Sequence, residues 1–244
     1  MIYNIVKKAG EMLMKKFVVT ILILLMIFIG MYIYRKNTII NSQKKEINVE
    51  EVTKIETYMQ EIYMWKEVTK DALPEFENIN QAPELWIWEV VKKNMEQYEL
   101  TYDEIQNKAK EIFGNEFNKE FPKDGYEYMK YDDTKKKYIA SGTTLDKKDD
   151  SFLLDTITKV ENGYTVKIIE YLEDYSGLDE SQNTEYNIKI ENLSEQEIGE
   201  VKSTEDESNI QAMVKQNIDK FTKKEVRLEK DENGNIYVTS VKNI

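Results

Sequence analysis

The most regular hydrophobic feature of the chain is an uninterrupted apolar run from Phe17 to Tyr34. Two lysines precede this run, and an arginine and a lysine follow it. At roughly 1.5 Å per residue, a helix of this length spans about 27 Å, close to the hydrocarbon thickness of a bilayer. A buried helix of a soluble domain would have a polar face over about five turns. The run therefore predicts a transmembrane helix over residues 17–34.

We expect this helix to remain attached as a signal anchor. No small-residue cleavage pattern follows the run, and the chain has no cysteine that could carry a lipid. The two flanks carry equal numbers of basic residues, so the positive-inside rule does not decide the orientation. A short lysine-rich head before an apolar run is typical of an export signal, which favours a cytoplasmic N-terminus. Residues 1–16 are then a cytoplasmic tail, and residues 35–45 are a polar juxtamembrane spacer.

The start of the chain has a second interpretation. Met14, followed by two lysines and a phenylalanine, is itself typical of the start of an exported bacterial chain. Under this interpretation translation starts at Met14, and residues 1–13 result from a start codon assigned too early. Both interpretations predict a single-pass protein of the cell membrane, with residues 46–244 as a domain outside the cytoplasm.

Residues 46–73 have the periodicity of an amphipathic helix. Its stripe recurs at alternating steps of three and four residues, at Ile55, Tyr58, Ile62, Trp65, Thr69 and Ala72. The pattern covers about two heptads, which is shorter than the repeat that indicates a coiled coil. We therefore expect the stripe to pack on its own domain, with a homodimer through this helix as the alternative.

Two further helices are predicted before the first strand. Prolines at positions 74 and 83 enclose a loop, and Pro83 suits the first helical position of the second helix. The apolar face of this helix consists of Leu85, Trp88, Val91, Met95 and Tyr98. Thr101 and Glu104 form a capping box for the third helix, which Gly114 ends. Its buried stripe consists of Ile105, Ala109 and Ile112.

After Pro122 the pattern changes to that of strands, first over residues 126–132 and 137–141. The clearest hairpin joins residues 152–160 to residues 164–172 through Glu-Asn-Gly. We predict a three-residue loop with the glycine in a left-handed bulge position. This register places Tyr164 and Lys159 on opposite faces of the hairpin.

The last hairpin uses the same tripeptide, at residues 232–234. With the same type of loop, Val226 and Leu228 meet Ser240 and Val238 on one face. Two such turns are too little evidence for an internal repeat, because Glu-Asn-Gly is common in hairpins.

Between the hairpins we expect an acidic loop over residues 173–185, a strand over residues 186–191 and a fourth helix. Ser203 or Thr204 can cap that helix. The order of three helices, several strands, one helix and two strands favours an α+β domain with an antiparallel sheet. A curved sheet wrapped around the long helices, of the cystatin-like or NTF2-like kind, is the architecture that this order suggests.

Charge narrows the classes of partner. Residues 37–244 carry 28 basic and 45 acidic side chains. Such a surface repels phosphate backbones, which argues against nucleic-acid binding, and it equally disfavours docking on anionic lipid. We expect a protein of the cell envelope or a small ligand as the partner instead.

The absence of both cysteine and histidine excludes several chemistries. Disulfides, zinc sites of the Cys/His type, and Ser-His-Asp or Cys-His catalysis are all ruled out. None of the nine glycines falls in the spacing of a phosphate-binding loop. The sequence therefore selects no catalytic, cofactor-binding or metal-ligating residue.

The densest group of carboxylates surrounds the expected acidic loop and includes Glu170, Glu173, Asp174, Asp179, Glu180 and Glu185. A calcium loop of the EF-hand type needs oxygen ligands at alternate positions with glycine at the sixth. This stretch does not keep that spacing, so we interpret it as a solvated loop.

The aromatic side chains supply the candidate partner-binding residues, Trp65, Trp86 and Tyr58. Trp88 fits the buried face of the second helix, whereas Trp86 lies two positions away and is expected to be exposed. Core packing is the simpler explanation for the aromatic set as a whole. The favoured hypothesis is a non-catalytic domain that binds a protein or a small ligand, and the alternative is a surface hydrolase that uses two carboxylates.

Overall fold

The structure, a computed structural model, describes residues 47–142, 147–177, 186–204 and 207–244. The predicted tail, transmembrane helix and spacer all lie outside these residues. Among the helices of the described residues, none has the length and apolar composition that crossing a bilayer requires. The residues from Ile47 onwards form a unit of their own, and it contains the whole fold described below.

The first helical region consists of two helices rather than one. Helix α2 covers Val49–Ile62, and after an extended stretch the short helix α3 covers Lys66–Thr69. The prediction of a continuous helix over residues 46–73 is therefore wrong. The carboxylate of Asp150 accepts a hydrogen bond from the backbone nitrogen of Lys66 at the start of α3. This tertiary contact outweighs the local helix propensity.

The apolar stripe of this region packs on its own domain, which confirms the favoured interpretation. Trp65 is half-buried, and the buried members are Ile55, Tyr58, Ile62, Thr69 and Ala72. The side chains that would form the seam of a homodimer in the alternative interpretation are thus largely enclosed within one chain.

Helix α4 (Glu84–Lys93) begins one residue later than predicted, because Pro83 is its N-cap, and it ends at Lys93, before Met95 and Tyr98 of the predicted face. Its buried face is broader than expected. Trp86 and Trp88 are 0% and 2% exposed, whereas Tyr98 is 73% exposed. The prediction that Trp86 is exposed is therefore wrong. Helix α4 contacts α2, α3 and α5, so it is enclosed from several sides and has no single apolar stripe.

Helix α5 (Tyr102–Phe113) confirms its predicted start and end. Both hydrogen bonds of the capping box between Thr101 and Glu104 are present. Gly114 follows the last turn with a φ of +87°, which explains why a glycine ends the helix. A single 3-10 turn at Ile79–Gln81 lies in the loop before α4.

The main sheet is antiparallel throughout, which confirms the α+β class. Its strands are β5 (Lys148–Val160), β6 (Gly163–Asp174), β7 (Asn187–Glu191), β8 (Glu197–Lys202), β9 (Thr222–Lys230) and β10 (Ile236–Asn243). Along one edge of β6, β9 pairs with residues 163–170 and β7 with residues 172–174. Strand β5 pairs along the other edge of β6. The described part of the chain places no further strand beyond β5.

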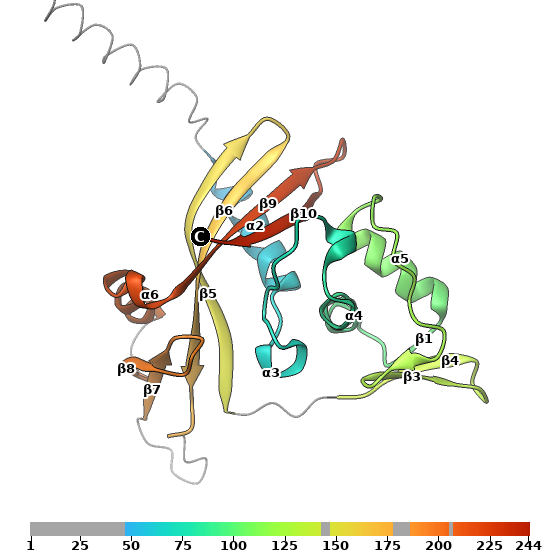
Figure 1. Ribbon diagram of the computed structural model, residues 1–244, viewed down its shortest axis with the longest axis horizontal. Coiled ribbons are helices and arrows are strands. Elements are labelled where there is room, and N and C mark those ends of the chain that lie inside the picture. The colour runs from blue at the N-terminus through green and yellow to red at the C-terminus, as the bar shows by residue number, and fades with distance from the viewer. Residues whose placement is uncertain (1–46, 143–146, 178–185, 205–206) are drawn as a thin grey trace, which may run out of the picture. The chain divides into compact units, whose positions relative to one another are not determined.

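A second, smaller sheet lies beside α4 and α5 (Figure 1). Its order is β1-β4-β3-β2, formed by β1 (Glu99–Leu100), β2 (Gly125–Tyr126), β3 (Met129–Asp132) and β4 (Lys137–Ala140). The single strand predicted over residues 126–132 is in fact divided between β2 and β3. The strand predicted over residues 137–141 is confirmed.

The register of the β5–β6 hairpin differs from the prediction by one residue. Val160 pairs with Gly163, and Lys159 pairs with Tyr164 on the same face. Gly163 belongs to strand β6 rather than to the loop. A Cβ atom there would lie 2.0 Å from the carbonyl oxygen of Leu228 in β9. Close approach of a neighbouring strand therefore requires this glycine.

The β9–β10 hairpin follows its predicted register only near the turn. Leu228 pairs with Val238, as expected, but Val226 pairs with Val241 instead of Ser240. A bulge between Val238 and Ser240 shifts the alignment by one position.

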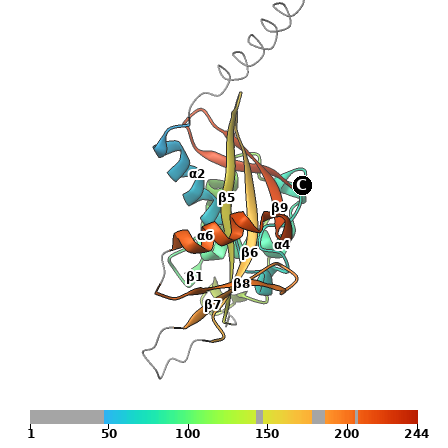
Figure 2. The ribbon, with the colours of Figure 1, turned by 90° about the vertical axis from the view of Figure 1, so that its left-hand side faces the viewer.

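The helices cover both faces of the main sheet (Figures 1 and 2). Helices α2, α4 and α5 form the larger core with β6, β9 and β10. On the other face, α6 (Glu207–Gln216) covers a second cluster that includes Leu153, Ile169 and Val214. A 3-10 turn at Ile218–Lys220 connects α6 to β9. Strand β5 therefore lies between α2 on one face and α6 on the other.

A candidate binding groove along strand β5

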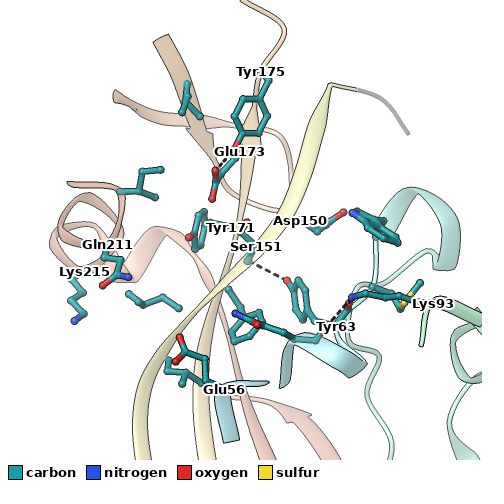
Figure 3. A pocket seen from close by; sticks show the side chains of 18 of the residues that line it. Glu56, Tyr63, Lys93, Asp150, Ser151, Tyr171, Glu173, Tyr175, Gln211 and Lys215 are labelled. Atoms are coloured by element: carbon teal, nitrogen blue, oxygen red, sulfur yellow. Dashed lines mark hydrogen bonds between the residues drawn. The ribbon is translucent and has the colours of Figure 1, made fainter. Parts of the chain in front are cut away.

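A groove of ≈ 770 Å³ follows strand β5 between α2 and α6. Figure 3 shows β5 in the middle, with Tyr63 and Lys93 on one side and Gln211 and Lys215 on the other. Residues from α2, the 63–65 stretch, β5, β6 and α6 line it. The groove is thus built by segments that are far apart in the sequence.

The floor of the groove is the edge of β5 that no described strand occupies. The backbone nitrogen of Tyr175 donates to the carbonyl oxygen of Lys147, which fixes the hydrogen-bonding phase of the β5–β6 pair. Alternate residues of an antiparallel strand direct their N–H and C=O groups to opposite edges. Ser151 and Leu153 therefore face β6, while the backbone groups of Asp150, Phe152 and Leu154 are directed into the groove.

The α2 wall of the groove is aromatic. The rings of Tyr63 and Phe152 lie 4.8 Å apart between centroids. The ammonium group of Lys93 lies 5.2 Å from the ring centroid of Trp65 and donates to the backbone oxygens of Gln60 and Tyr63. Burial lowers the pKa of Lys93. Its position is thus held by neighbours on the same wall.

Asp150 is a carboxylate of β5 that lines the groove. Its Oδ2 atom accepts a hydrogen bond of 2.8 Å from the backbone nitrogen of Lys66. Its Oδ1 atom is buried without a hydrogen-bond partner among the described residues. Burial raises the pKa of Asp150 to about 6, and the hydrogen bond from Lys66 opposes this shift. Asp150 therefore has one carboxylate oxygen that no group of the described residues satisfies.

The opposite wall is more apolar. Leu153, Ile188 and Ile210 line it, and Gln211 and Lys215 of α6 form its rim. Above them, the hydroxyl of Tyr175 donates to the carboxylate of Glu173. This wall offers apolar surface at the base and polar groups at the mouth.

A buried ionic cluster supports the α2 wall from behind. Glu170 is 0% exposed and Lys224 is 2% exposed, and Lys224 Nζ lies 3.0 Å from Glu170 Oε2. Lys224 also contacts Oδ1 of Asp71 at 2.8 Å. The hydroxyl of Tyr63 donates to Glu170 Oε1 over 3.2 Å. Burial raises the pKa of Glu170 to about 7, although Lys224 partly offsets this effect.

Glu170 of this cluster and Asp150 of the groove together predict that the free energy of unfolding falls as the pH rises from about 5 to about 7. Glu170 and Asp150 have folded-state pKa values of about 7 and about 6. In that window the folded state therefore retains protons that the unfolded state has released, so ionisation opposes folding by at most about 1.4 kcal/mol per pH unit for each group. Glu51, whose pKa hydrogen bonds from Lys159 and Tyr164 lower to about 2, contributes no slope there.

Urea unfolding of the full chain at a series of pH values measures this slope. Glu170→Gln should flatten it, whereas Glu51→Gln should lower the stability at every pH in the window without changing the slope. An unchanged slope in the Glu170→Gln variant would contradict the assignment.

The structure places the three predicted partner-binding residues in different environments. Trp65 lines the groove and is half-buried. The indole nitrogen of Trp86 donates to the backbone oxygen of Ala72 over 3.1 Å within the core. The hydroxyl of Tyr58 is also enclosed, where it donates to the backbone oxygen of Ile112. Trp65 alone of the three is open to a partner.

Of the carboxylates singled out in the sequence, those that the structure describes do not form one cluster. Asp179, Glu180 and Glu185 lie outside the described residues, and Glu170 is buried beside Lys224. In the described part of the chain, no group of three or more acidic side chains could hold a metal ion.

Sequence reasoning missed the polar residues around the groove, although one signal was present. Lys224 alternates with Val226 and Leu228, which puts a lysine on the inward face of a predicted strand. Glu170 similarly interrupts an apolar stretch of β6. A charged side chain on the buried face of a strand requires a partner of opposite charge. Lys224 and Glu170 could therefore have been predicted to pair with each other.

Comparison with known proteins adds no evidence on function, so the groove is the main evidence for it. No protein-family model, no curated protein and no solved structure matches the chain.

Proposed function

We propose that this chain is a single-pass, membrane-anchored bacterial surface protein whose domain over residues 46–244 binds a protein or a small ligand without catalysis. The single observation that carries the proposal is the groove along β5, with a strand edge that no described strand covers and the half-buried indole of Trp65. A half-buried tryptophan beside a groove is the kind of group that supplies binding energy at interfaces.

The anchoring part of the proposal rests on the apolar run over residues 17–34 and its basic flanks. Element order suggests a cystatin-like or NTF2-like arrangement. Helix α2 packs against β6, β9 and β10, as such an arrangement requires. Protease treatment of intact cells should degrade the domain, because we expect it outside the cytoplasm. A domain that stays intact until the cells are lysed would contradict this orientation.

A surface hydrolase with two carboxylates is the alternative, and the groove supports it less well. Such an enzyme needs two carboxyl groups about 5 to 10 Å apart around the scissile bond. Asp150 pairs with Leu172, so Glu173 extends from the opposite face of the sheet. Glu170 is fully buried and ion-paired with Lys224. These three carboxylates therefore do not converge on one point, and Glu56, the remaining carboxylate of the groove, lies toward the opposite end of it from Asp150 (Figure 3).

Photo-cross-linking in intact cells tests the proposed binding site. We expect benzoylphenylalanine in place of Trp65 to give a discrete adduct with a cell-envelope component. The matched control is the same group in place of Tyr98, which is 73% exposed and does not line the groove. An adduct from both positions, or from neither, would contradict a binding site at the groove.

A further inference from the structure

We propose that the groove takes an extended, positively charged polypeptide segment, which pairs with residues 148–154 of β5 as an additional strand. This inference rests on the proposed binding function and specifies the partner. Addition of a strand to an uncovered sheet edge is a general mode of peptide recognition, in which main-chain hydrogen bonds give affinity and alternate side chains give specificity.

The backbone of β5 supplies the first part of the argument. The N–H and C=O groups of Asp150, Phe152 and Leu154 are directed away from β6, as the phase of the β5–β6 pair requires. The bulge between Leu154 and Thr156 ends this regular stretch. Bulges are one device by which proteins prevent unwanted pairing at a sheet edge. The edge is thus interrupted beyond residue 154 and regular before it.

The position of this edge selects a single extended segment over a second copy of the chain. Residues of α2, among them Glu56 and Gln60, line one side of the groove, and Gln211 and Lys215 of α6 line the other. The β5 edge is therefore recessed between two helices. A β5 strand from another copy would be recessed in the same way, so the helices of the two copies would collide before the strands could pair. A segment without flanking helices has no such obstacle.

Charge selects the composition of the segment. Three carboxylates line the groove, on Glu56, Asp150 and Glu173, against two ammonium groups, on Lys93 and Lys215. The ammonium group of Lys93 is already held by two backbone oxygens, whereas Oδ1 of Asp150 has no partner among the described residues. A lysine or arginine side chain of the ligand would supply the positive charge that balances these carboxylates. The net negative charge of residues 37–244 adds to the attraction.

The two walls predict an alternating pattern in the bound segment. Successive side chains of an added strand point to opposite faces of the sheet. One set would meet Asp150 and Trp65 on the α2 side, and the other would meet Leu153, Ile188 and Ile210 on the α6 side. Basic residues fit the first wall and aliphatic residues fit the second.

Fluorescence anisotropy with labelled peptides tests this inference on the full chain in a non-ionic detergent. The probe is a nine-residue peptide of alternating lysine and valine, compared with one of alternating glutamate and valine. Two further peptides are the lysine–valine sequence N-methylated either at all lysine amides or at all valine amides. Asp150→Asn removes the charge while retaining an acceptor for Lys66, and Asp155→Asn is the matched control in the same strand, because Asp155 does not line the groove.

We expect the lysine–valine peptide to bind and the glutamate–valine peptide to bind at least about tenfold more weakly. At least one of the two N-methylated peptides should bind about tenfold or more weakly than the unmethylated peptide, because several main-chain hydrogen bonds disappear together. Asp150→Asn should weaken binding several-fold, and Asp155→Asn should leave it unchanged.

Failure of all peptides to bind would overturn the inference, as would equal binding of the glutamate peptide or of both N-methylated peptides. A groove-specific adduct from the Trp65 position in cells, together with any of these failures, would leave the proposed function standing and remove strand addition. Absence of that adduct would remove the proposed function itself.

Discussion

Replacing Lys224 with methionine should lower the free energy of unfolding by about 3–5 kcal/mol at pH 8. The substitution leaves the fully buried carboxylate of Glu170 without the ammonium group that lies 3.0 Å from it. The loss should be smaller at pH 5, because Glu170, with a pKa raised to about 7 by burial, is then protonated in the folded state.

Urea unfolding of the full chain in detergent, monitored by tryptophan fluorescence, measures this effect. All three tryptophans lie within residues 65–88, so the signal reports on the folded domain. The double variant Lys224→Met, Glu170→Leu should recover much of the lost stability, since it removes the uncompensated charge as well. A double variant as unstable as the single one would mean that Lys224 acts through its packing and not through Glu170.

Trp86→Ala should destabilise the domain by about 3–5 kcal/mol, the usual cost of truncating a buried tryptophan. Its ring centroid lies 5.6 Å from that of Phe76 and 5.7 Å from that of Phe113. Its indole nitrogen donates a hydrogen bond to the backbone oxygen of Ala72. Truncation would therefore leave a cavity between α4 and α5, and the backbone oxygen of Ala72 would keep only its hydrogen bond from the backbone nitrogen of Met64.

Tyr98→Ala is the matched control, with an expected change within about 0.5 kcal/mol, because its side chain is largely exposed. The remaining tryptophans provide the fluorescence signal in the Trp86→Ala variant. A loss below about 1 kcal/mol would contradict the central place of Trp86 in the core.

The parts of the fold that depend on neighbouring residues could be predicted from the sequence. The capping box of Thr101 and Glu104 is an interaction across three positions, and it is present as predicted. Gly114 at the end of the same helix is equally local. The antiparallel hairpins and the α+β class followed from the same kind of signal.

The errors have tertiary causes. The break after α2 depends on Asp150, which bonds Lys66 from far along the chain. The register of the first hairpin depends on the close approach of Leu228 to Gly163. The burial of Trp86 depends on α4 being enclosed by three other helices, which no helical periodicity could indicate.

The candidate site was predicted only in part for the same reason. Trp65 was named from the sequence, and it does line the groove. Asp150 was not selected, because 45 acidic residues in the region from residue 37 onwards gave no basis for choosing one. The uncovered edge of β5 is a property of strand order, and strand order could not be read from a single chain.

Amide hydrogen exchange along β5, measured by NMR on the full chain in detergent without added ligand, tests the central claim most directly. The claim is that one edge of β5 is open to the groove. The amides of Asp150, Phe152 and Leu154 should exchange at least about tenfold faster than those of Ser151 and Leu153, which bond β6. Uniform protection of all five amides would show that this edge is already covered, and it would contradict the account.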